Sequence, residues 1–185
     1  WLWTSPFNSD TTALFPKIKA MGYDAVEIPV ENPTLIDTNK VKAALVEHGL
    51  KPVICGAFGT SRDLTHEDPS YHQNSFNYIE ACFEIAAELE AKFVAGPMYS
   101  SVGKARLVSP EQKKVDWDRA ATNLHKVCRM AEAKGLEIAL EALNRFETDL
   151  INTAEDLMRL IKDINHPAAK VLLDAFHMNI EEPDI

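Results

Sequence analysis

Residues 134–141 read Lys-Gly-Leu-Glu-Ile-Ala-Leu-Glu, in which a glycine joins a long helical pattern to a short apolar run ending on a carboxylate. The same kind of junction occurs at residues 21–23 and 48–50, where a glycine again follows a helical pattern and precedes a strand-like segment. Glycine readily adopts the left-handed backbone conformation that ends a helix, so each junction predicts a helix followed directly by a strand. The chain is therefore predicted to repeat a unit of strand and helix.

Outward from these junctions, short apolar runs alternate with longer amphipathic patterns along the whole chain. The runs are apolar on consecutive positions, which is typical of a parallel sheet covered by helices. Capping residues support the helix starts, because Asp68 and Ser109 precede first-turn prolines, and Asn152 and Glu155 have capping-box spacing. The strands are predicted near 1–4, 24–30, 51–57, 92–97, 136–141 and 169–174, and the helices near 11–21, 38–48, 70–90, 111–134 and 153–164.

This alternation predicts a parallel α/β fold, either an open doubly wound sheet or a closed (β/α)8 TIM barrel. The G-x-G-x-x-G fingerprint of dinucleotide-binding folds does not follow the first predicted strand, so the barrel is preferred. A complete barrel takes about 250 residues. This chain has 185 residues and ends where a sixth helix is expected. We therefore expect residues 1–185 to form a single incomplete TIM-barrel domain with about the first six strand–helix units.

Composition and charge exclude several classes of protein. The chain has 19 Lys and Arg against 28 Asp and Glu, a net charge of −9, whereas a nucleic-acid-binding surface needs an excess of basic residues. No apolar run approaches the roughly 18 residues of a membrane span. The cysteines Cys55, Cys82 and Cys128 form no CxxC pair, and we expect three small buried side chains in a cytoplasmic protein. The expected partner is a small molecule, with neither nucleic acid nor membrane.

Two predicted neighbouring strands end on carboxylates, Glu141 and Asp174. Ligands of parallel α/β folds bind at the carboxyl ends of the strands, and neighbouring strands lie about 4.8 Å apart. The two carboxylates are therefore placed to share a divalent cation. The alternative is structural, in which a strand-end carboxylate caps the following turn and Glu147 pairs with Arg145 or Lys162. The spacing alone leaves both interpretations open.

Other side chains near the predicted strand ends also allow two interpretations. His177, taken alone, is more often a satisfied loop histidine than a ligand. Trp1 and Trp3 share one face of the first predicted strand, where core packing is the ordinary role. Aromatic walls also line sugar sites, so Trp3 is counted as a candidate substrate-binding residue. Lys104 and Arg106 are either a solvated basic pair or contacts for an anionic group such as a sugar phosphate.

Two blocks of sequence carry a resemblance to a known family. Residues 140–148 read Leu-Glu-Ala-Leu-Asn-Arg-Phe-Glu-Thr, and residues 173–182 read Leu-Asp-Ala-Phe-His-Met-Asn-Ile-Glu-Glu. Together, in this order, they resemble the ketose 3-epimerases, the D-tagatose and D-allulose (psicose) 3-epimerase group of the xylose-isomerase-like barrel superfamily. Residues 4–7 and 22–27 are similar to that group as well, so the resemblance runs over the whole chain.

The resemblance implies a site, residue by residue. Glu141 matches a metal-binding glutamate that is also one of two acid/base groups. Asp174 matches the next metal ligand, and Glu147 and His177 match residues that hold the oxygens near the first carbons of the substrate. Family members complete the metal site with a histidine and a second glutamate on the seventh and eighth strands. Those two residues are expected beyond residue 185.

The implied reaction inverts carbon 3 of a ketohexose by removing a proton beside the ketone and returning one on the opposite face, through an enediolate. A divalent metal supplies Lewis-acid stabilisation, and oxygen ligands with some imidazole suit Mn²⁺ first, with Mg²⁺ or Co²⁺ as alternatives. Two other functions stay open. One is a related sugar or sugar-phosphate isomerase, of the aldose–ketose or hydroxypyruvate type, and the other is an inactive truncated fragment lacking half of the metal site. The resemblance also implies a homo-oligomer, a dimer or tetramer, for the intact protein.

Overall fold

Five strands form one parallel sheet in the computed structural model, which describes residues 2–185. The strands lie side by side in chain order, so each one pairs with the next along the chain. The predicted parallel α/β class is therefore confirmed. The strands are β1 Ala25–Val30, β2 Lys51–Gly56, β3 Phe93–Gly96, β4 Glu137–Glu141 and β5 Ala169–Leu172.

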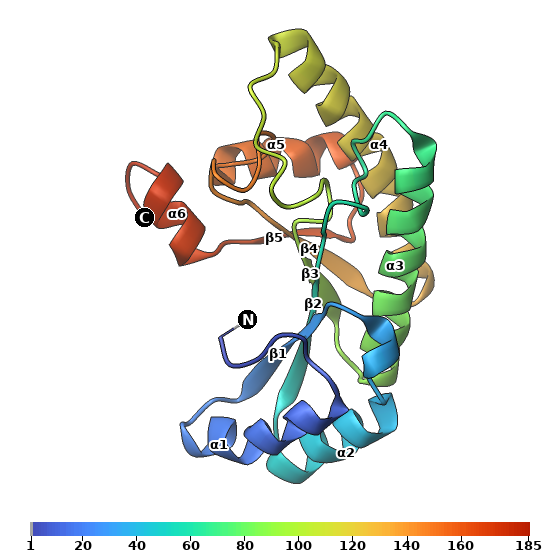
Figure 1. Ribbon diagram of the computed structural model, residues 1–185, viewed down its shortest axis with the longest axis vertical. Helices are drawn as coiled ribbons and strands as arrows, with labels where there is room; N and C mark the ends of the chain where they lie inside the picture. The colour runs from blue at the N-terminus through green and yellow to red at the C-terminus, as the bar shows by residue number, and fades with distance from the viewer. Residues whose placement is uncertain (1) are drawn as a thin grey trace.

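Helices connect the strands and cover the outer side of the sheet. Figure 1 shows α3, α4 and α5 along that side, α1 and α2 near the β1 end, and α6 on the opposite side. Strands inside and helices outside are the arrangement of a TIM barrel. The α-helices are α1 Phe15–Ala20, α2 Thr38–His48, α3 Pro69–Glu88, α4 Pro110–Ala133, α5 Ala154–Ile164 and α6 Ala175–Glu181, with 3-10 helices η1 Ser9–Leu14 and η2 Pro33–Leu35.

The hydrophobic core lies between the sheet and these helices. Helix α3 buries a face that includes Ile79 and Phe83, and it contacts β2 and β3. The spacing of four residues between these two side chains brings both to one face of the helix. The three cysteines are buried free thiols, as predicted: Cys55, Cys82 and Cys128. None of the helices in residues 2–185 is long and apolar enough to span a membrane.

Local signals in the sequence give most of the helix bounds. Asp68 and Ser109 cap α3 and α4 through hydrogen bonds from backbone N–H groups of the first turn, as predicted. Gly49 ends α2 in the left-handed conformation, with φ 60°. The predicted cap of α5 is wrong by one residue, because Thr153 caps this helix. The Asn152 amide instead donates to two carbonyls of the preceding loop.

Two predictions near the amino terminus are wrong. Of the strand expected at 1–4, residue 1 lies outside the described residues, and residues 2–4 form no strand. In the described part of the chain β1 pairs only with β2, so residues 2–4 have no ladder partner. The helix expected at 11–21 is divided into η1 and α1, and Pro16 lies in the first turn of α1. Proline favours this position because its missing N–H is not needed there.

Helix α6 is a further departure from the predicted elements. The strand expected to reach residue 174 ends at Leu172, and the chain then turns into α6 at Ala175. Asp174 caps this helix, since its Oδ1 accepts from the backbone N–H of Phe176 at 2.8 Å. His177 therefore lies on a helix and not in a loop, and a sixth α-helix begins before residue 185.

Candidate active site

A cavity of about 720 Å³ lies at the carboxyl ends of the strands. Five acidic side chains line it, and within residues 2–185 none of its lining residues is Lys or Arg. Parallel strands all end on the same side of the sheet, which explains why residues far apart in the sequence meet here. The acidic residues are Glu27 on β1, Glu31 just after β1, Glu141 at the end of β4, Glu147 in the loop after β4, and Asp174 at the start of α6.

Three potential ligand atoms lie close together in this cavity. Glu141, Asp174 and His177 each offer one atom, and these atoms all lie within 4.8 Å of one another. The Oε1 atom of Glu141 lies 3.7 Å from Nε2 of His177. Asp174 caps α6 and His177 follows in its first turn, so both side chains face the end of β4. The predicted neighbourhood of Glu141 and Asp174 is present in the structure.

The electrostatics of the cavity disfavour a fully ionised, metal-free state. Burial, followed in order of importance by the charges of Asp174, Glu27 and Glu147, raises the pKa of Glu141 to about 7. Carboxylates gathered in one site without a counter-charge repel each other in this way. A divalent cation would remove the repulsion, and hard oxygen donors are the ligands that Mn²⁺ and Mg²⁺ take. The donor set of Glu141 and Asp174 therefore fits a divalent cation.

Asp174 also has the structural role that the sequence allowed, in which a carboxylate at the strand end caps the following turn, because this residue caps α6. The cap uses Oδ1 alone, and a carboxylate has a second oxygen available for another partner. Capping and metal binding are therefore compatible at this position.

Glu147 does not make the structural pair that the sequence allows. Arg145 instead pairs with Glu181 of α6 at 2.8 Å, which lowers the pKa of that carboxyl group. No ion pair joins Glu147 to Lys162 in residues 2–185. Glu147 Oε1 accepts a hydrogen bond from Nδ2 of Asn144 at 2.8 Å, and the residue lines the cavity. Among residues 2–185, the carboxylate of Glu147 thus lies beside Glu141 without a basic partner.

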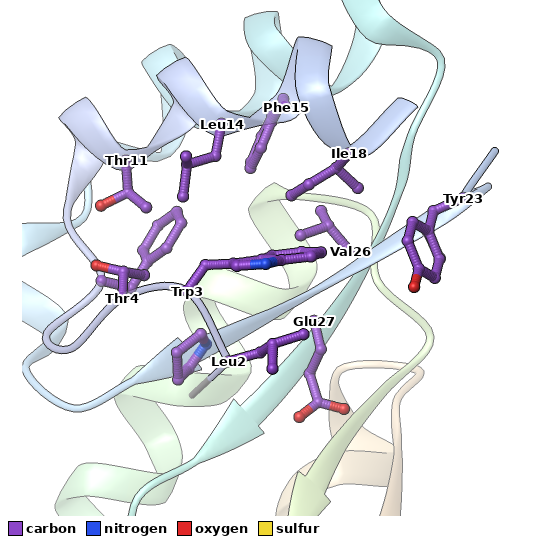
Figure 2. A pocket seen from close by; sticks show the side chains of 13 residues that line it. Leu2, Trp3, Thr4, Thr11, Leu14, Phe15, Ile18, Tyr23, Val26 and Glu27 are labelled. Atoms are coloured by element: carbon purple, nitrogen blue, oxygen red, sulfur yellow. The ribbon is translucent and has the colours of Figure 1, made fainter. Parts of the chain in front are cut away.

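Trp3 lies in a different cavity from Glu141. This second cavity has a volume of about 340 Å³, and its walls are mainly apolar. Figure 2 shows the Trp3 ring between side chains of α1 and the side chain of Leu2. The ring is 44% exposed and meets Tyr23 edge-on, with 6.2 Å between the ring centroids. Glu27 lines both cavities, so the cavity that contains Trp3 borders the acidic cavity at this residue.

Lys104 and Arg106 are both paired with carboxylates of the chain. Lys104 Nζ lies 2.7 Å from Asp63 Oδ2, and Arg106 Nε lies 2.9 Å from Asp149 Oδ2. Arg106 also binds the buried Asp116 at 2.6 Å. The Lys104 side chain is 13% exposed and that of Arg106 is 39% exposed, so the predicted solvated pair is wrong for Lys104 alone. Contact with an anionic group stays a prediction.

The sequence interpretation missed Glu27 and Glu31 as cavity residues. Glu27 is the only charged residue of β1, opposite Val53 of β2, and this break in an apolar strand is the signal that identifies it. Glu31 follows the same strand and accepts hydrogen bonds from Ser5 Oγ at 2.6 Å and Phe7 N at 3.1 Å. Glu31 thus holds the amino-terminal segment against the cavity, whereas Glu27 adds charge to it.

A parallel strand–helix repeat with an acidic cavity at the strand ends defines an α/β protein of the TIM-barrel kind. The chain belongs to the xylose isomerase-like TIM barrel family, which matches residues 15–185. The resemblance noted in the sequence is thereby confirmed at the level of the family.

Individual relatives are sugar epimerases. The chain is 30% identical to the D-psicose 3-epimerase of Ruminiclostridium cellulolyticum over 99% of its own length and 63% of the relative's. It is 32% identical to the 3-dehydro-D-guloside 4-epimerase of Escherichia coli, covering 97% of this chain and 69% of that protein. Among solved structures, the D-allulose 3-epimerase from Methylomonas sp. in complex with D-allulose matches with a TM-score of 0.89 and 26% identity, over 98% of this chain and 62% of that one. The chain thus spans 63% of the length of the first of these relatives.

Proposed function

We propose that the protein containing this chain is a metal-dependent epimerase that inverts carbon 3 of a ketohexose. The observation that carries the proposal is the gathering of Glu141 and Asp174 beside His177 at the carboxyl ends of β4 and β5. Membership in a family whose members include ketose 3-epimerases supports the same reaction.

Glu141 and Asp174 would hold the divalent cation, with Mn²⁺ first and Mg²⁺ or Co²⁺ as alternatives. The cation would supply Lewis-acid stabilisation of negative charge on the substrate oxygens. The histidine and second glutamate that the resemblance implies would complete its ligand set. The absence of lysine and arginine from the described cavity lining supports a cation as the counter-charge.

Each of the remaining residues has a proposed task. Glu141 exchanges a proton with carbon 3 of the sugar, since a buried carboxylate at the strand end can approach the reacting carbon. Glu147 and His177 hold the oxygens near the first carbons, through the carboxylate of the former and Nε2 of the latter. Trp3 contributes from the adjoining cavity beyond Glu27, so we propose that it affects sugar binding more weakly than the other residues.

A second candidate function uses the same chemistry at another carbon. The relative from Escherichia coli is named as a 4-epimerase of a 3-dehydro sugar, and it is 32% identical to this chain. Proton removal beside a carbonyl is common to 3-epimerases, 4-epimerases and aldose–ketose isomerases. The epimerases return a proton to the opposite face of the same carbon, at carbon 3 or carbon 4, whereas an isomerase returns it to the neighbouring carbonyl carbon. The product must therefore be analysed.

We also propose that the intact protein is a cytoplasmic homo-oligomer, a dimer or tetramer, that acts on a free small sugar. Light scattering on the full-length protein measures its mass in solution. A monomer at all concentrations would contradict this part of the proposal.

The decisive assay incubates the full-length protein with D-fructose, D-tagatose and their 3-epimers, with Mn²⁺ or with a chelator. We expect interconversion at carbon 3 that is lost on chelation and falls by roughly a thousandfold in a Glu141→Gln variant. Glu137→Gln is the matched control, because Glu137 lies on the same strand at its opposite end, where it pairs with Lys170 at 3.3 Å. Unchanged activity in Glu141→Gln, or formation of an aldose as the product, would overturn the proposal.

A further inference from the structure

We propose that Asn144 is a positioning residue that orients Glu147 and fixes His177 as the tautomer with its proton on Nε2. The geometry of this inference stands on the structure alone, and only its catalytic consequence rests on the proposed function. Asn144 lies in the loop after β4 and is 2% exposed. A buried side-chain amide of this kind needs partners for its oxygen and for both of its hydrogens.

The partners of the Asn144 side chain determine how its amide is oriented. Its Oδ1 accepts from the backbone N–H of Phe146 at 3.0 Å, and a backbone N–H can only donate. Nδ2 must therefore face the other two neighbours. It lies 2.8 Å from Oε1 of Glu147 and 2.9 Å from Nδ1 of His177. The two amide hydrogens thus bind one residue each, and no polar atom of the side chain is left over.

The same contacts determine the tautomer of His177. The backbone N–H of Asn144 also points at Nδ1 of His177, at 3.1 Å. Two N–H donors therefore meet at one ring nitrogen, which requires that Nδ1 carry no hydrogen. The proton of the neutral ring must then be on Nε2.

The tautomer decides whether His177 can bind a metal ion or donate a hydrogen bond. A protonated Nε2 has no lone pair for a metal ion, although it lies among the three potential ligand atoms within 4.8 Å. It is instead a hydrogen-bond donor directed into the cavity, toward Oε1 of Glu141 at 3.7 Å. The geometry thus assigns His177 to an oxygen atom of the substrate and leaves the cation to Glu141 and Asp174.

The surrounding contacts hold Asn144 against α6. Arg145 binds Glu181 of α6 through its side chain and through its backbone N–H. The backbone carbonyl of Asn144 accepts from the N–H groups of Glu147 and Thr148, which closes the loop around it. Asn144 is therefore fixed at the contact between the loop after β4 and helix α6.

Two substitutions of Asn144 test its effect on the His177 tautomer and its effect on Glu147 separately. Asn144→Asp keeps the shape of the side chain but replaces the amide donor by a carboxylate oxygen facing Nδ1 and Glu147. We expect this change to move the His177 proton toward Nδ1. Asn144→Ala removes all three side-chain hydrogen bonds but leaves the backbone N–H that points at Nδ1. We therefore expect it to keep the tautomer and to release Glu147.

The first test is nitrogen-15 NMR on histidine-labelled, metal-free full-length protein, at a pH where the histidines are neutral. The chain has six histidines, and a His177→Gln variant identifies the signals of His177. We expect the shift of a bare nitrogen for Nδ1 and of a protonated nitrogen for Nε2, with a change in Asn144→Asp and none in Asn144→Ala. A proton on Nδ1 of the unmodified protein, or an unaltered spectrum in Asn144→Asp, would overturn the inference.

The second test measures kcat and KM of Asn144→Ala on the ketose that the unmodified enzyme converts. Loss of a residue that orients binding groups should lower kcat/KM by about 10- to 100-fold. Asn152→Ala is the control, because the Asn152 amide binds only the carbonyls of Leu143 and Thr148 in the same loop. Equal losses in the two folded variants would overturn the positioning role. If the unmodified protein converts no ketose, the proposed function fails, and the NMR result still decides the tautomer.

Discussion

Two groups of charged residues lie on the loop side of the sheet, and their chemistry differs. The ion-pair network joins Asp63, Asp116 and Asp149 to Lys104, Arg106 and Arg119. The carboxylate cluster gathers Glu27, Glu141, Glu147 and Asp174 without any lysine or arginine in the described lining of its cavity. The charges of the ion-pair network are neutralised within the chain, whereas the carboxylates of the cluster repel one another.

The difference between the two groups can be seen in the pKa of one carboxylate from each. Burial alone would raise the pKa of Asp63, but hydrogen bonds from Lys104 and Thr65 outweigh burial and lower it. Burial also raises the pKa of Glu141, and there the neighbouring carboxylates raise it further, to about 7. The Asp63 and Glu141 side chains are 3% and 14% exposed, so burial acts on both. The directions differ because hydrogen bonds and a cation outweigh burial at Asp63, whereas the neighbours of Glu141 add to its effect.

The largest effect is expected from breaking the ion-pair network. Asp116→Ala leaves Arg106 and Arg119 without their buried partner, whose side chain is 3% exposed. Loss of one member of a buried ion pair costs about 3 kcal/mol of the free energy of unfolding. Denaturant unfolding measures this loss. The control is Asp118→Ala, whose carboxylate is 60% exposed beside Lys114 and should cost under about 0.5 kcal/mol. Equal losses of unfolding free energy in the two variants would contradict the expectation that the buried ion pair contributes more stability than the exposed one.

The next effect concerns the affinity of the cluster for a cation. Asp174→Asn keeps the oxygen that caps α6 but removes the negative charge, and Asn is as good a cap as Asp. We expect normal folding and a loss of Mn²⁺ affinity of about 100-fold or more, measured by titration calorimetry. Asp68→Asn makes the same change at the cap of α3 and should not alter Mn²⁺ affinity. Equal affinity in Asp174→Asn and the unmodified protein would exclude Asp174 as a ligand.

The third effect is a pH dependence of stability in the metal-free protein. Folding raises the pKa of Glu141 from 4.5 to about 7, so the folded state binds more protons than the unfolded state in this range. The free energy of unfolding should therefore fall as the pH rises from about 4.5 to 7, by about 2 kcal/mol after allowance for solvent screening. The measured quantity is the difference between the unmodified protein and Glu141→Gln at each pH. A difference that does not change with pH would contradict the raised pKa of Glu141.

The smallest effect is expected at the second cavity. Trp3 is 44% exposed and its aromatic partner is Tyr23, so Trp3→Ala should cost about 1 kcal/mol of stability. Among the described lining residues the two cavities share only Glu27, so Mn²⁺ affinity should stay unchanged. Calorimetry on the same variant measures the affinity. A loss as large as that of Asp174→Asn would mean that the two cavities form one site.

The features predicted correctly from the sequence are those set by local rules. Helix bounds follow from caps such as Asp68 and Ser109, and the meeting of Glu141 with Asp174 follows from the common edge of parallel strands. These signals require no knowledge of distant parts of the chain. The alternation of elements and the position of the cavity could therefore be predicted.

The features that sequence reasoning missed depend on distant partners. Lys104 binds Asp63 across 41 positions and Arg106 binds Asp149 across 43, so no local pattern reveals that these charges are paired. Asp174 caps α6, and its position after an apolar run hid the start of this helix. A strand at residues 2–4 needs a neighbour across the sheet, which only the tertiary structure can supply.

The most direct measurement is exchange of carbon-bound hydrogen in D₂O, followed by NMR of the sugar. Full-length protein with Mn²⁺ and D-fructose should introduce deuterium at carbon 3, and Glu141→Gln should abolish this exchange. Such a result would identify the carboxylate cluster as a site for proton removal beside the ketone. Deuterium at carbon 1, or equal exchange at carbon 3 with and without the Glu141 carboxylate, would contradict it.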